Sequence, residues 1–574
     1  MAAEGEGPAD PLRRRRRRLR EAVRAASREA GAPRDFEPEL ERPRDPDHGD
    51  LASNAAMVLA GELGRPPREI AAELRDALEA DPAGVAAVEV AGPGFLNFRF
   101  DDRVWFEGLA DVLAADGDWG RVPAAGPERV NVEFVSANPT GPLHVAHGRG
   151  AALGDAVASL LEWTGHRVTR EFYLNDTGRQ IELLGASVEA RWRQIRGQQA
   201  EVPEDGYRGD YVRGLARELD GEIGTGRLEA MDREERVDRF AEEAAGRLRE
   251  GHRRDLEAFG VEMDEWRPES ELYASGRVER LLDRMEEEGL IYEEEGATWL
   301  ATTRFGDEKD RVLVKSDGSY TYFLPDIAYH LDKAERGFDR AVDVLGADHH
   351  GHVARMQAAL EGLGLEPGWL EAVILQLVSV LRGGEEVKMS KRAGHFVTLR
   401  ELFEDTGRDV ARYFFLMRRA DQHLNFDLDL ARDTSERNPV YKVKYAHARM
   451  WGVFEKGGVD PATLAPSPAE LSGLGTDAER AVARELLRFP GVVEGAAAAR
   501  APHRVCGYLE EVAGRVNAWY HEGNLDPSLR VLAEGPARPG RLALARAVQV
   551  TLRNGLELLG LEAPEEMTRE EEAT

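Results

Sequence analysis

A strand pattern, a helix pattern and a second strand pattern follow one another between residues 130 and 174, and this order constrains the fold more than any other feature. The apolar run Val130–Val135 leads through a loop to a helix from about His147 to Trp163, which Gly165 ends. The second strand, Arg167–Leu174, follows at once. Strands joined in this way pair in parallel, because a parallel connection needs a crossover of roughly a dozen residues or more. The sequence therefore predicts an α/β domain built on a parallel sheet.

Three later stretches are further strand candidates for this domain: Arg311–Lys315, Arg340–Leu345 and Glu371–Val380. The segment between the second strand and these candidates, about 180–290, is mostly charged and has helical patterns. We therefore expect a helical insertion into the sheet domain, and we place the whole domain at 125–420.

A small α+β module is expected before the sheet domain. Three helices and two strands are predicted there, at residues 12–30, 51–63, 67–80, 88–90 and 95–100. The two strands alternate around the turn Gly92-Pro93-Gly94. The stretch Gly117–Pro127 is rich in glycine, alanine and proline, which is typical of a linker. The module is therefore expected at 1–115.

An all-helical domain is expected after the sheet domain, at 421–574. Four clear helical segments are predicted in it, at residues 441–454, 476–488, 502–521 and 539–559. A loop rich in glycine, proline and serine separates the first two, at 457–475.

Composition excludes several classes of protein. The chain has 106 acidic and 76 basic residues, a net charge of −30, which argues against a protein that coats a polyanion with its whole surface. Cys506 is the only cysteine, so there is no internal disulfide and no cysteine-based metal site. No apolar stretch is long enough for a membrane-spanning helix, and we expect a reducing, cytoplasmic setting. Only eight of the basic residues are lysines, so each lysine that the chain keeps is expected to have a specific use.

The first candidate site follows the first strand, in the sequence Asn138-Pro-Thr-Gly-Pro-Leu-His144-Val-Ala-His147-Gly-Arg-Gly. A loop between a parallel strand and a helix lies at the carboxyl edge of the sheet, where α/β proteins bind ligands. The helix N-terminus attracts phosphate, and His144 and His147 can both donate hydrogen bonds to its oxygens. The alternative is zinc binding, but the histidine pair lacks a third ligand, so we predict no bound metal.

The second candidate site is Val387-Lys388-Met389-Ser390-Lys391-Arg392, which follows the turn Gly383-Gly384. Two of the eight lysines fall within four residues there, beside small or flexible neighbours. A loop that carries ammonium groups suits a migrating negative charge, such as that on a leaving pyrophosphate. The alternative is an ordinary solvated basic loop.

Together the H-x-x-H and K-M-S-K patterns resemble those of class I aminoacyl-tRNA synthetases, and nearly the whole chain resembles the arginyl-tRNA synthetase family. The segments that carry the resemblance are 136–144, 170–178, 346–351, 392–399, 425–430, 48–54 and 91–97. The resemblance implies a Rossmann-like catalytic domain, a tRNA-contacting N-terminal module and a helical anticodon-binding domain. It also implies attachment of L-arginine to tRNA(Arg) through an arginyl-adenylate, with ATP and its Mg²⁺ as co-substrate and with AMP and pyrophosphate released.

By the same resemblance, five residues are expected to bind arginine: Glu133, Ser136, Asn138, Tyr322 and Asp326. Such a pocket needs carboxylates for the guanidinium fork, and Glu133 is a charge in an otherwise apolar strand. Other interpretations stay open. Glu133 can be a solvent-facing residue of an edge strand, Asp326 a helix N-cap, and Tyr320 or Tyr173 the pocket tyrosine in place of Tyr322. Acidic residues would attract lysine as well as arginine.

The resemblance assigns catalytic roles to His144, His147, Lys388 and Lys391, and ATP contacts to Ala146, Gly148, Gly346, Asp348, Met389 and Ser390. The histidines would stabilise the phosphate transition state, and the lysines would follow the pyrophosphate. No side chain need act as a base, because the attacking carboxylate is already an anion. The family has glycine where this chain has Ala146, and the extra methyl predicts weaker ATP binding.

Contacts to tRNA are expected at both ends of the chain. The candidates are the run Arg13–Arg18 and four aromatic residues of the helical domain, Tyr441, Tyr445, Trp519 and Tyr520. A solvated helix face and ordinary core aromatics are the alternatives. A non-catalytic tRNA-binding paralogue would be expected to lose the histidines or the lysines, which this chain keeps. A small-molecule nucleotidyltransferase would have no use for the two flanking domains. We expect a monomer.

Overall fold

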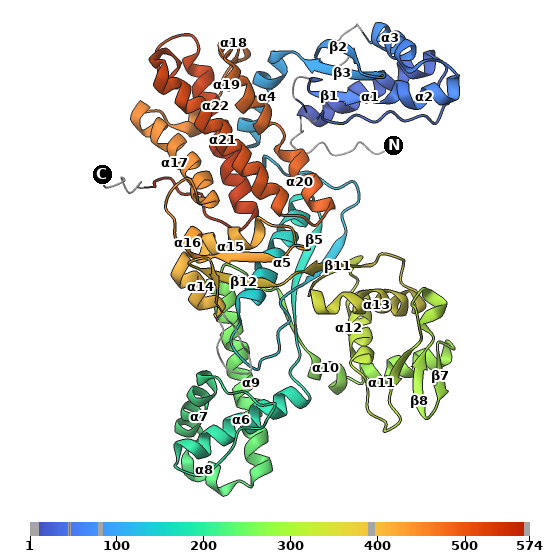
Figure 1. Cartoon of the computed structure of the whole chain (residues 1–574), viewed down its shortest axis with the longest axis vertical. Helices are drawn as coiled ribbons and strands as arrows, with labels where there is room; N and C mark the ends of the chain where they lie inside the picture. The colour runs from blue at the N-terminus through green and yellow to red at the C-terminus, as the bar shows by residue number, and fades with distance from the viewer. Residues whose placement is uncertain (1–10, 44, 46–47, 79–83, 388–396, 568–574) are drawn as a thin grey trace.

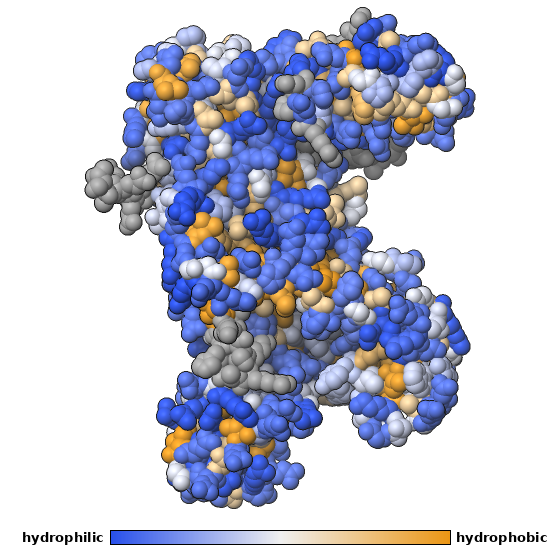
Figure 2. Space-filling model, viewed as in Figure 1, coloured by the Kyte–Doolittle hydropathy of each residue, from blue (hydrophilic) through white to orange (hydrophobic). Residues whose placement is uncertain are grey.

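The computed structural model describes residues 11–43, 45, 48–78, 84–387 and 397–567. Figure 1 shows an elongated molecule with an N-terminal lobe and a group of C-terminal helices at one end and two further lobes at the other. The face in Figure 2 is mostly hydrophilic, with hydrophobic residues in small groups. In the part of the chain that is described, no helix is both long and apolar enough to cross a membrane.

Five strands form a central sheet in the order β11-β10-β4-β5-β6, and all neighbouring pairs are parallel. Their bounds are β4 Arg129–Glu133, β5 Arg167–Leu174, β6 Glu265–Pro268, β10 Arg340–Gly346 and β11 Leu370–Leu375. Helix α5, Val145–Trp163, crosses from β4 to β5 and confirms the expected strand–helix–strand unit. Because β4 is the central strand, the loop that follows it lies at the carboxyl edge of the sheet, between neighbours on both sides.

Helix α5 lies deep in the molecule, with every residue from Gly148 to Ala158 buried. Two of its glycines are needed for close packing. A Cβ at Gly154 would lie 2.1 Å from Phe134 Cγ, and one at Gly148 would lie 2.6 Å from Leu399 Cδ1. The small residues of α5 therefore fix the position of its N-terminus relative to the sheet.

Two strand predictions are wrong in part. Arg311–Lys315 does form a strand, β9 (Arg311–Val314), but it belongs to an antiparallel sheet with β7 (Ile291–Glu294) and β8 (Ala297–Leu300). The stretch Glu371–Val380 is not one strand, because it is divided between β11 of the central sheet and β12 (Val378–Arg382) of another sheet. Patterns of alternation show that a strand forms but not which sheet receives it.

The stretch 180–290 contains more than a helical insertion. Helices α6 (Arg179–Ile195), α7 (Asp210–Ile223), α8 (Thr225–Ala230) and α9 (Arg233–Ala258) form one lobe with its own core. The chain then returns to the central sheet as β6, which the sequence analysis missed. A second lobe follows β6 and holds α10 (Glu269–Ala274), α11 (Arg277–Glu287), the β7–β9 sheet, α12 (Phe323–Glu335) and α13 (His350–Gly362).

The N-terminal lobe has the expected α+β composition. Its elements are α1 (Pro11–Glu29), β1 (Leu51–Ser53), α2 (Ala55–Leu63), α3 (Pro67–Ala77), β2 (Val85–Ala91) and β3 (Phe95–Phe100). The first residues of the helix expected at 51–63 are instead the strand β1, which pairs with β3. Helix α4, Asp102–Ala115, then leads to the central domain.

The C-terminal region is helical, as expected. Its main helices are α17 (Pro439–Gly457), α19 (Asp477–Leu486), α20 (Phe489–Ala498), α21 (His503–Leu525) and α22 (Arg538–Leu558), with the short α18 (Pro468–Leu471) between the first two. Before them come α14 (Leu399–Thr406), α15 (Arg408–Leu416), β14 (Leu424–Asp427) and α16 (Leu428–Ala431). Strand β14 pairs in parallel with β12, in a three-stranded sheet with β13 (Glu385–Glu386) that is separate from the central sheet.

Candidate active site

The turn after β4 is held in a strained conformation. Val135 and Ser136 have φ values of 72° and 40°, which residues other than glycine rarely adopt. Such a conformation costs about 1–3 kcal/mol per residue and persists only where its surroundings fix it. Ser136 Oγ donates to Glu133 Oε1 at 2.8 Å and accepts the N–H of Tyr173 at 3.1 Å. These two bonds fix Ser136 against the end of the neighbouring strand β5.

The two histidines of the first motif lie together at the start of α5. His144 is the N-cap residue and its N–H donates to His147 Nδ1 at 3.2 Å. Their rings stack with centroids 3.7 Å apart and planes inclined by 17°. A neutral His147 whose Nδ1 accepts carries its proton on Nε2, so that nitrogen is a donor. The pair therefore places imidazole groups beside the backbone N–H groups of a helix N-terminus, an arrangement that suits phosphate.

The two small residues of this motif have different surroundings. Ala146 is exposed in the first turn of α5, while Gly148 is buried and faces Leu399 and Phe415. Gly148 thus has a packing role in the structure, whereas Ala146 lies at the surface where a ligand can reach it.

The second motif, Lys388, Met389, Ser390 and Lys391, lies outside the described residues. The chain resumes next to the first motif. Thr398 forms an antiparallel bridge with His144, and the N–H of Leu399 donates to Leu143 O at 2.8 Å. The C-terminal flank of the second motif is thus hydrogen-bonded to the histidine loop.

Gly346 and Asp348 lie at the carboxyl end of β10, next to β4 in the sheet. Asp348 is exposed, and His349 Nε2 lies 3.5 Å from its Oδ2. A Cβ at Gly346 would lie 2.6 Å from Asp348 Oδ1, so glycine leaves room for this carboxylate. Both residues are open to a ligand at the edge where the histidine pair lies.

Of the three histidines that follow, His352 faces inward. Its Nε2 lies 3.1 Å from Asp326 Oδ2, and its ring meets Phe323 edge-on at 5.8 Å. His350 is exposed. The structure thus joins His352 to one of the residues expected to bind arginine.

Glu133 is buried on the central strand, so the edge-strand interpretation is wrong. Its Oε2 lies 2.6 Å from Nζ of Lys333, which is fully buried and also lies 3.0 Å from Asp343 Oδ1. Burial alone would lower the pKa of Lys333, but Asp343 and Glu133 raise it above its ordinary value. Burial would likewise raise the pKa of Asp343, but Lys333 and His330 hold it below the usual range. Burial raises the pKa of Glu133 although Lys333 opposes this, and Glu133 therefore shares one internal cation with Asp343.

Asp326 and Tyr322 lie at the start of α12. Tyr322 is the N-cap residue and Asp326 belongs to the first turn, so the N-cap interpretation of Asp326 is wrong. Asp326 is partly exposed and Tyr322 is 77 % exposed. Asn138 Nδ2 donates to Gln180 Oε1 at 2.8 Å, which links the histidine loop to the start of α6.

Sequence analysis missed Glu269, which is buried in the first turn of α10. Tyr273 donates a hydrogen bond to its Oε1 at 3.3 Å. Burial, and then the nearby charge of Asp326, raises the pKa of Glu269. Burial and the charges of Glu269 and Asp326 also raise the pKa of Tyr173. These carboxylates form an electronegative cluster around Tyr173, which would be relieved by a bound cation.

Glu133, His330 and Asp343 lie close enough together to hold a metal ion. However, Lys333 Nζ already contacts both carboxylates, and His330 Nε2 lies 2.7 Å from Asp343 Oδ2. The side-chain ammonium group of Lys333 therefore occupies the position that a metal ion would need.

A parallel sheet with phosphate-seeking groups at the N-terminus of the helix after its central strand is the arrangement of a class I aminoacyl-tRNA synthetase, and comparison with known families agrees. Residues 109–427 match the family described as tRNA synthetases class I (R), catalytic domain. Residues 17–100 match the arginyl tRNA synthetase N-terminal domain, and residues 443–567 match the DALR anticodon binding domain. The chain belongs to the arginyl-tRNA synthetase family.

Curated relatives and solved structures support this assignment. The chain is 44% identical to the arginine–tRNA ligase of Bacillus subtilis over 556 residues, 96% of this chain and 98% of that protein. It is 46% identical to that of Listeria monocytogenes over 533 residues, 92% of this chain and 94% of the relative. The Thermus thermophilus arginyl-tRNA synthetase structure matches with a TM-score of 0.73 and 26% identity, covering 96% of this chain and 100% of that one.

Proposed function

We propose that the chain joins L-arginine to tRNA(Arg) through an arginyl-adenylate, with ATP as its Mg²⁺ complex as co-substrate. One observation carries the proposal. A stacked histidine pair at a helix N-terminus and a cluster of carboxylates around Tyr173 lie at the same edge of one parallel sheet, and Ser136, in the loop before the histidines, accepts a hydrogen bond from the N–H of Tyr173. The first group suits phosphate and the second suits a cationic amino acid.

The arginine pocket in this proposal consists of Glu133, Ser136, Asn138, Tyr322 and Asp326, to which we add Glu269. Asp326 and Glu269 supply the negative charge, because Glu133 is paired with the internal cation Lys333. Glu133 acts chiefly through Oε1, which holds Ser136 in its strained turn. A guanidinium desolvated among carboxylates and tyrosines is bound through charge-assisted hydrogen bonds.

The first chemical step needs no base. The carboxylate of arginine attacks the α-phosphorus of ATP, the bond to the bridging oxygen breaks, and pyrophosphate leaves with that electron pair. His144 and His147 donate hydrogen bonds to the phosphate oxygens as charge builds up on them. We assign Lys388 and Lys391 to the departing pyrophosphate. The terminal ribose hydroxyl of tRNA then attacks the adenylate carbonyl, and AMP leaves.

ATP is assigned to the open edge between α5 and β10. Ala146 and Gly148 provide the start of α5, and Gly346 and Asp348 the end of β10, where Asp348 suits the ribose hydroxyls. Met389 and Ser390 complete the assignment from the second motif. The hydrogen bond between Leu399 and Leu143 supports it, because it anchors that motif's flank beside the histidines.

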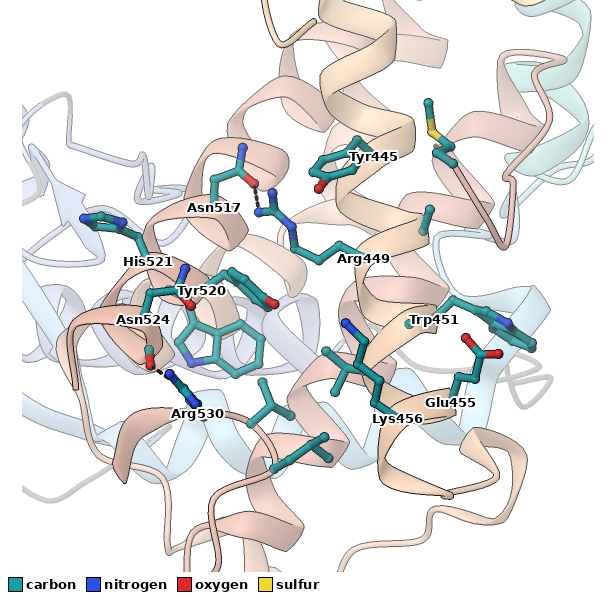
Figure 3. Close-up of a pocket in the computed structure, with 18 of the residues that line it drawn as sticks. Tyr445, Arg449, Trp451, Glu455, Lys456, Asn517, Tyr520, His521, Asn524 and Arg530 are labelled. Atoms are coloured by element: carbon teal, nitrogen blue, oxygen red, sulfur yellow. Dashed lines mark hydrogen bonds between the residues drawn. The ribbon is translucent and has the colours of Figure 1, made fainter. Parts of the chain in front are cut away.

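A cavity in the helical domain supports tRNA binding. It has a volume of about 910 Å³ and lies between α17 and α21 (Figure 3). The guanidinium of Arg449 lies over two rings, 4.5 Å from the centre of Tyr445 and 4.7 Å from that of Tyr520. Planar groups with a nearby cation are suited to an unpaired base. Tyr445 and Tyr520 are therefore better candidates than Trp519, which is 3% exposed.

The domain assignment that goes with this function is 1–115 for a tRNA-contacting module, 125–420 for catalysis and 421–574 for anticodon binding. The family matches at 17–100, 109–427 and 443–567 support it. Arg13–Arg18 on α1 would contact tRNA phosphates. We propose a monomer that acts in the cytoplasm.

The test is exchange of labelled pyrophosphate into ATP with arginine or lysine, each with and without tRNA. Exchange with arginine and not with lysine is expected. Transfer of labelled arginine to tRNA then tests the second step. Silence in every arm from a folded protein would refute the proposal, and exchange with lysine alone would refute the choice of amino acid.

The variants His144→Asn and His147→Asn test whether these histidines stabilise the phosphate transition state, with His350→Asn as the control. Each is expected to lower kcat for exchange about 10²–10³-fold, the range for loss of one transition-state donor. His350→Asn, on the exposed surface of α13, is expected to leave kcat within about twofold. Equal effects of all three substitutions would contradict the assignment.

A further inference from the structure

A second large cavity lies between the N-terminal lobe and the C-terminal helices, and none of its lining residues belongs to the candidate active site. Its volume is about 950 Å³, within the roughly 300–1,000 Å³ that small-molecule sites have. α1, β1 and α4 form one wall, and α19, α20 and α21 form the other. Figure 1 shows α20 next to the N-terminal lobe, where the two walls meet.

This cavity is lined by more basic than acidic residues, although the whole chain is acidic. Overall the chain has 106 acidic and 76 basic residues. Among the described residues, the lining instead has six arginines and four carboxylates: Arg13, Arg16, Arg42, Arg484, Arg488 and Arg515 against Asp50, Glu485, Glu494 and Glu511. A cavity of about 590 Å³ between α7 and α9 follows the composition, with four glutamates and three arginines. Of these two cavities, only the interdomain one has an excess of positive charge, and the excess is two charges.

The ion pairs inside the cavity use up the carboxylates. Arg488 Nη1 lies 3.1 Å from Glu511 Oε2 and also pairs with Glu485. The other two acids are paired as well, since Arg13 lies 3.4 Å from Glu494 and Arg484 lies 3.6 Å from Asp50. Arg515 makes no ion pair with any described residue.

Arg42 lies near a second arginine of the cavity, Arg488, as well as near three of its carboxylates. Burial, and then the positive charge of Arg488, lowers the pKa of Arg42. Burial raises the pKa of Asp50 even with Arg484 nearby. An anion that entered the cavity would offset the repulsion among the arginines.

The cations are all arginines, and they come from both domains. A guanidinium offers a planar fork of N–H donors that matches phosphate oxygens, and its charge does not depend on pH. Three of the six belong to the N-terminal lobe and three to the helical domain. A ligand with several phosphate groups could therefore reach both walls at once.

We propose that this interdomain cavity binds a phosphate-rich anion. The ligand is a free polyphosphate, including the phosphate chain of a nucleotide, and not the backbone of tRNA, which the N-terminal lobe is already proposed to contact. The site does not depend on the proposed ligase activity, because binding can be measured directly on the full chain.

Isothermal titration of the full chain with inorganic tripolyphosphate at about 0.15 M salt tests the proposal. The double variant Arg42→Gln/Arg515→Gln removes one cation from each wall and leaves the run Arg13–Arg18 intact. The matched control Arg20→Gln/Arg28→Gln changes the charge equally at exposed positions of α1 that lie outside Arg13–Arg18 and do not line the cavity. The cavity variant is expected to weaken tripolyphosphate binding about tenfold or more, and the control less than about twofold.

The same variants separate the two sources of phosphate. If tRNA competes with tripolyphosphate for the wild-type chain and binds the cavity variant more weakly, the cavity is part of the tRNA-binding surface and the proposal of a separate polyphosphate site is overturned. If tRNA neither competes nor loses affinity, a free polyphosphate is the ligand. Equal weakening of tripolyphosphate binding in the cavity and control variants, or no binding to a wild-type chain with a normal unfolding transition, would overturn the proposal.

Discussion

Lys333 Nζ lies 2.6 Å from Glu133 Oε2, and this contact joins helix α12 to the central strand β4 beneath the candidate active site. Three residues further along α12, Arg336 Nη1 donates to Glu171 Oε2 at 2.6 Å and to Glu265 Oε2 at 2.8 Å. The strand register places four carboxylates side by side across the sheet, those of Asp343, Glu133, Glu171 and Glu265. Each of two cations on one helix therefore bridges two neighbouring acids of the row, and this fixes the position of Asp326 on the same helix.

Replacing Lys333 with methionine should destabilise the protein by about 3–5 kcal/mol. The variant keeps the side-chain volume but leaves Glu133 and Asp343 buried without their cation. Urea unfolding followed by tryptophan fluorescence measures the loss. Lys315→Met, at an exposed position, is the matched control and should change stability by less than about 0.5 kcal/mol. Equal stability of the two variants would show that the buried pair contributes little.

Replacing Glu269 with glutamine should raise KM for arginine about tenfold or more and leave KM for ATP nearly unchanged. The physical reason is the loss of one buried charge from the cluster that faces the guanidinium, since a hydrogen bond to a charged group contributes about 1.5–3 kcal/mol. Pyrophosphate exchange at varied arginine and ATP concentrations measures both constants.

Glu271→Gln is the matched control, because Glu271 lies on the same short helix and is exposed. It should leave both constants within about twofold. If Glu269→Gln changed the two KM values equally, the residue would act on the fold and not on the choice of amino acid.

The central sheet could be predicted from the sequence because its strands are local apolar runs beside a helix with one apolar face. Val130–Val135 and Arg167–Leu174 carry this signal clearly. Strand β6, Glu265–Pro268, has no apolar run, and it forms only because Glu171 to Leu174 offers it a partner. Tertiary pairing thus decided the strand that the sequence patterns missed.

The site shows the same limit. The histidine pair and Asp348 could be found from the sequence because each follows a recognisable strand. Glu269 could not, because nothing in its neighbourhood shows that it is buried or that it approaches Asp326. Lys333 did carry a signal, since it is one of only eight lysines in a chain rich in arginine.

Replacing Ala146 with glycine should lower KM for ATP. Ala146 is exposed in the first turn of α5, so its methyl group lies where the assigned ATP contacts are. One methyl corresponds to about 0.8 kcal/mol, or about fourfold in affinity, if it holds the nucleotide away from the backbone. KM for arginine is an internal control and should not change. An ATP KM that stays the same or rises would show that the methyl does not hinder the nucleotide.

The helical domain should lose stability below neutral pH through His447. This residue is buried on α17, and its Nδ1 lies 2.8 Å from Pro564 O. Burial, only partly offset by that hydrogen bond, lowers its pKa to about 4. A lowered pKa on a base means that the unfolded chain binds the proton more readily, so the stabilisation is complete above about pH 6.5 and is lost as the pH falls toward 4.

Between pH 7 and pH 5 this residue alone should cost about 2 kcal/mol. Urea unfolding at the two pH values measures the difference, and His447→Gln should reduce it by that amount because glutamine does not titrate in this range. His350→Gln, at an exposed position, is the control for the loss of a histidine side chain as such. If the pH dependence stayed the same in His447→Gln, protonation elsewhere would cause the acid instability. If it fell, the contact between α17 and the segment at Pro564 would be the part of the helical domain that responds first to acid.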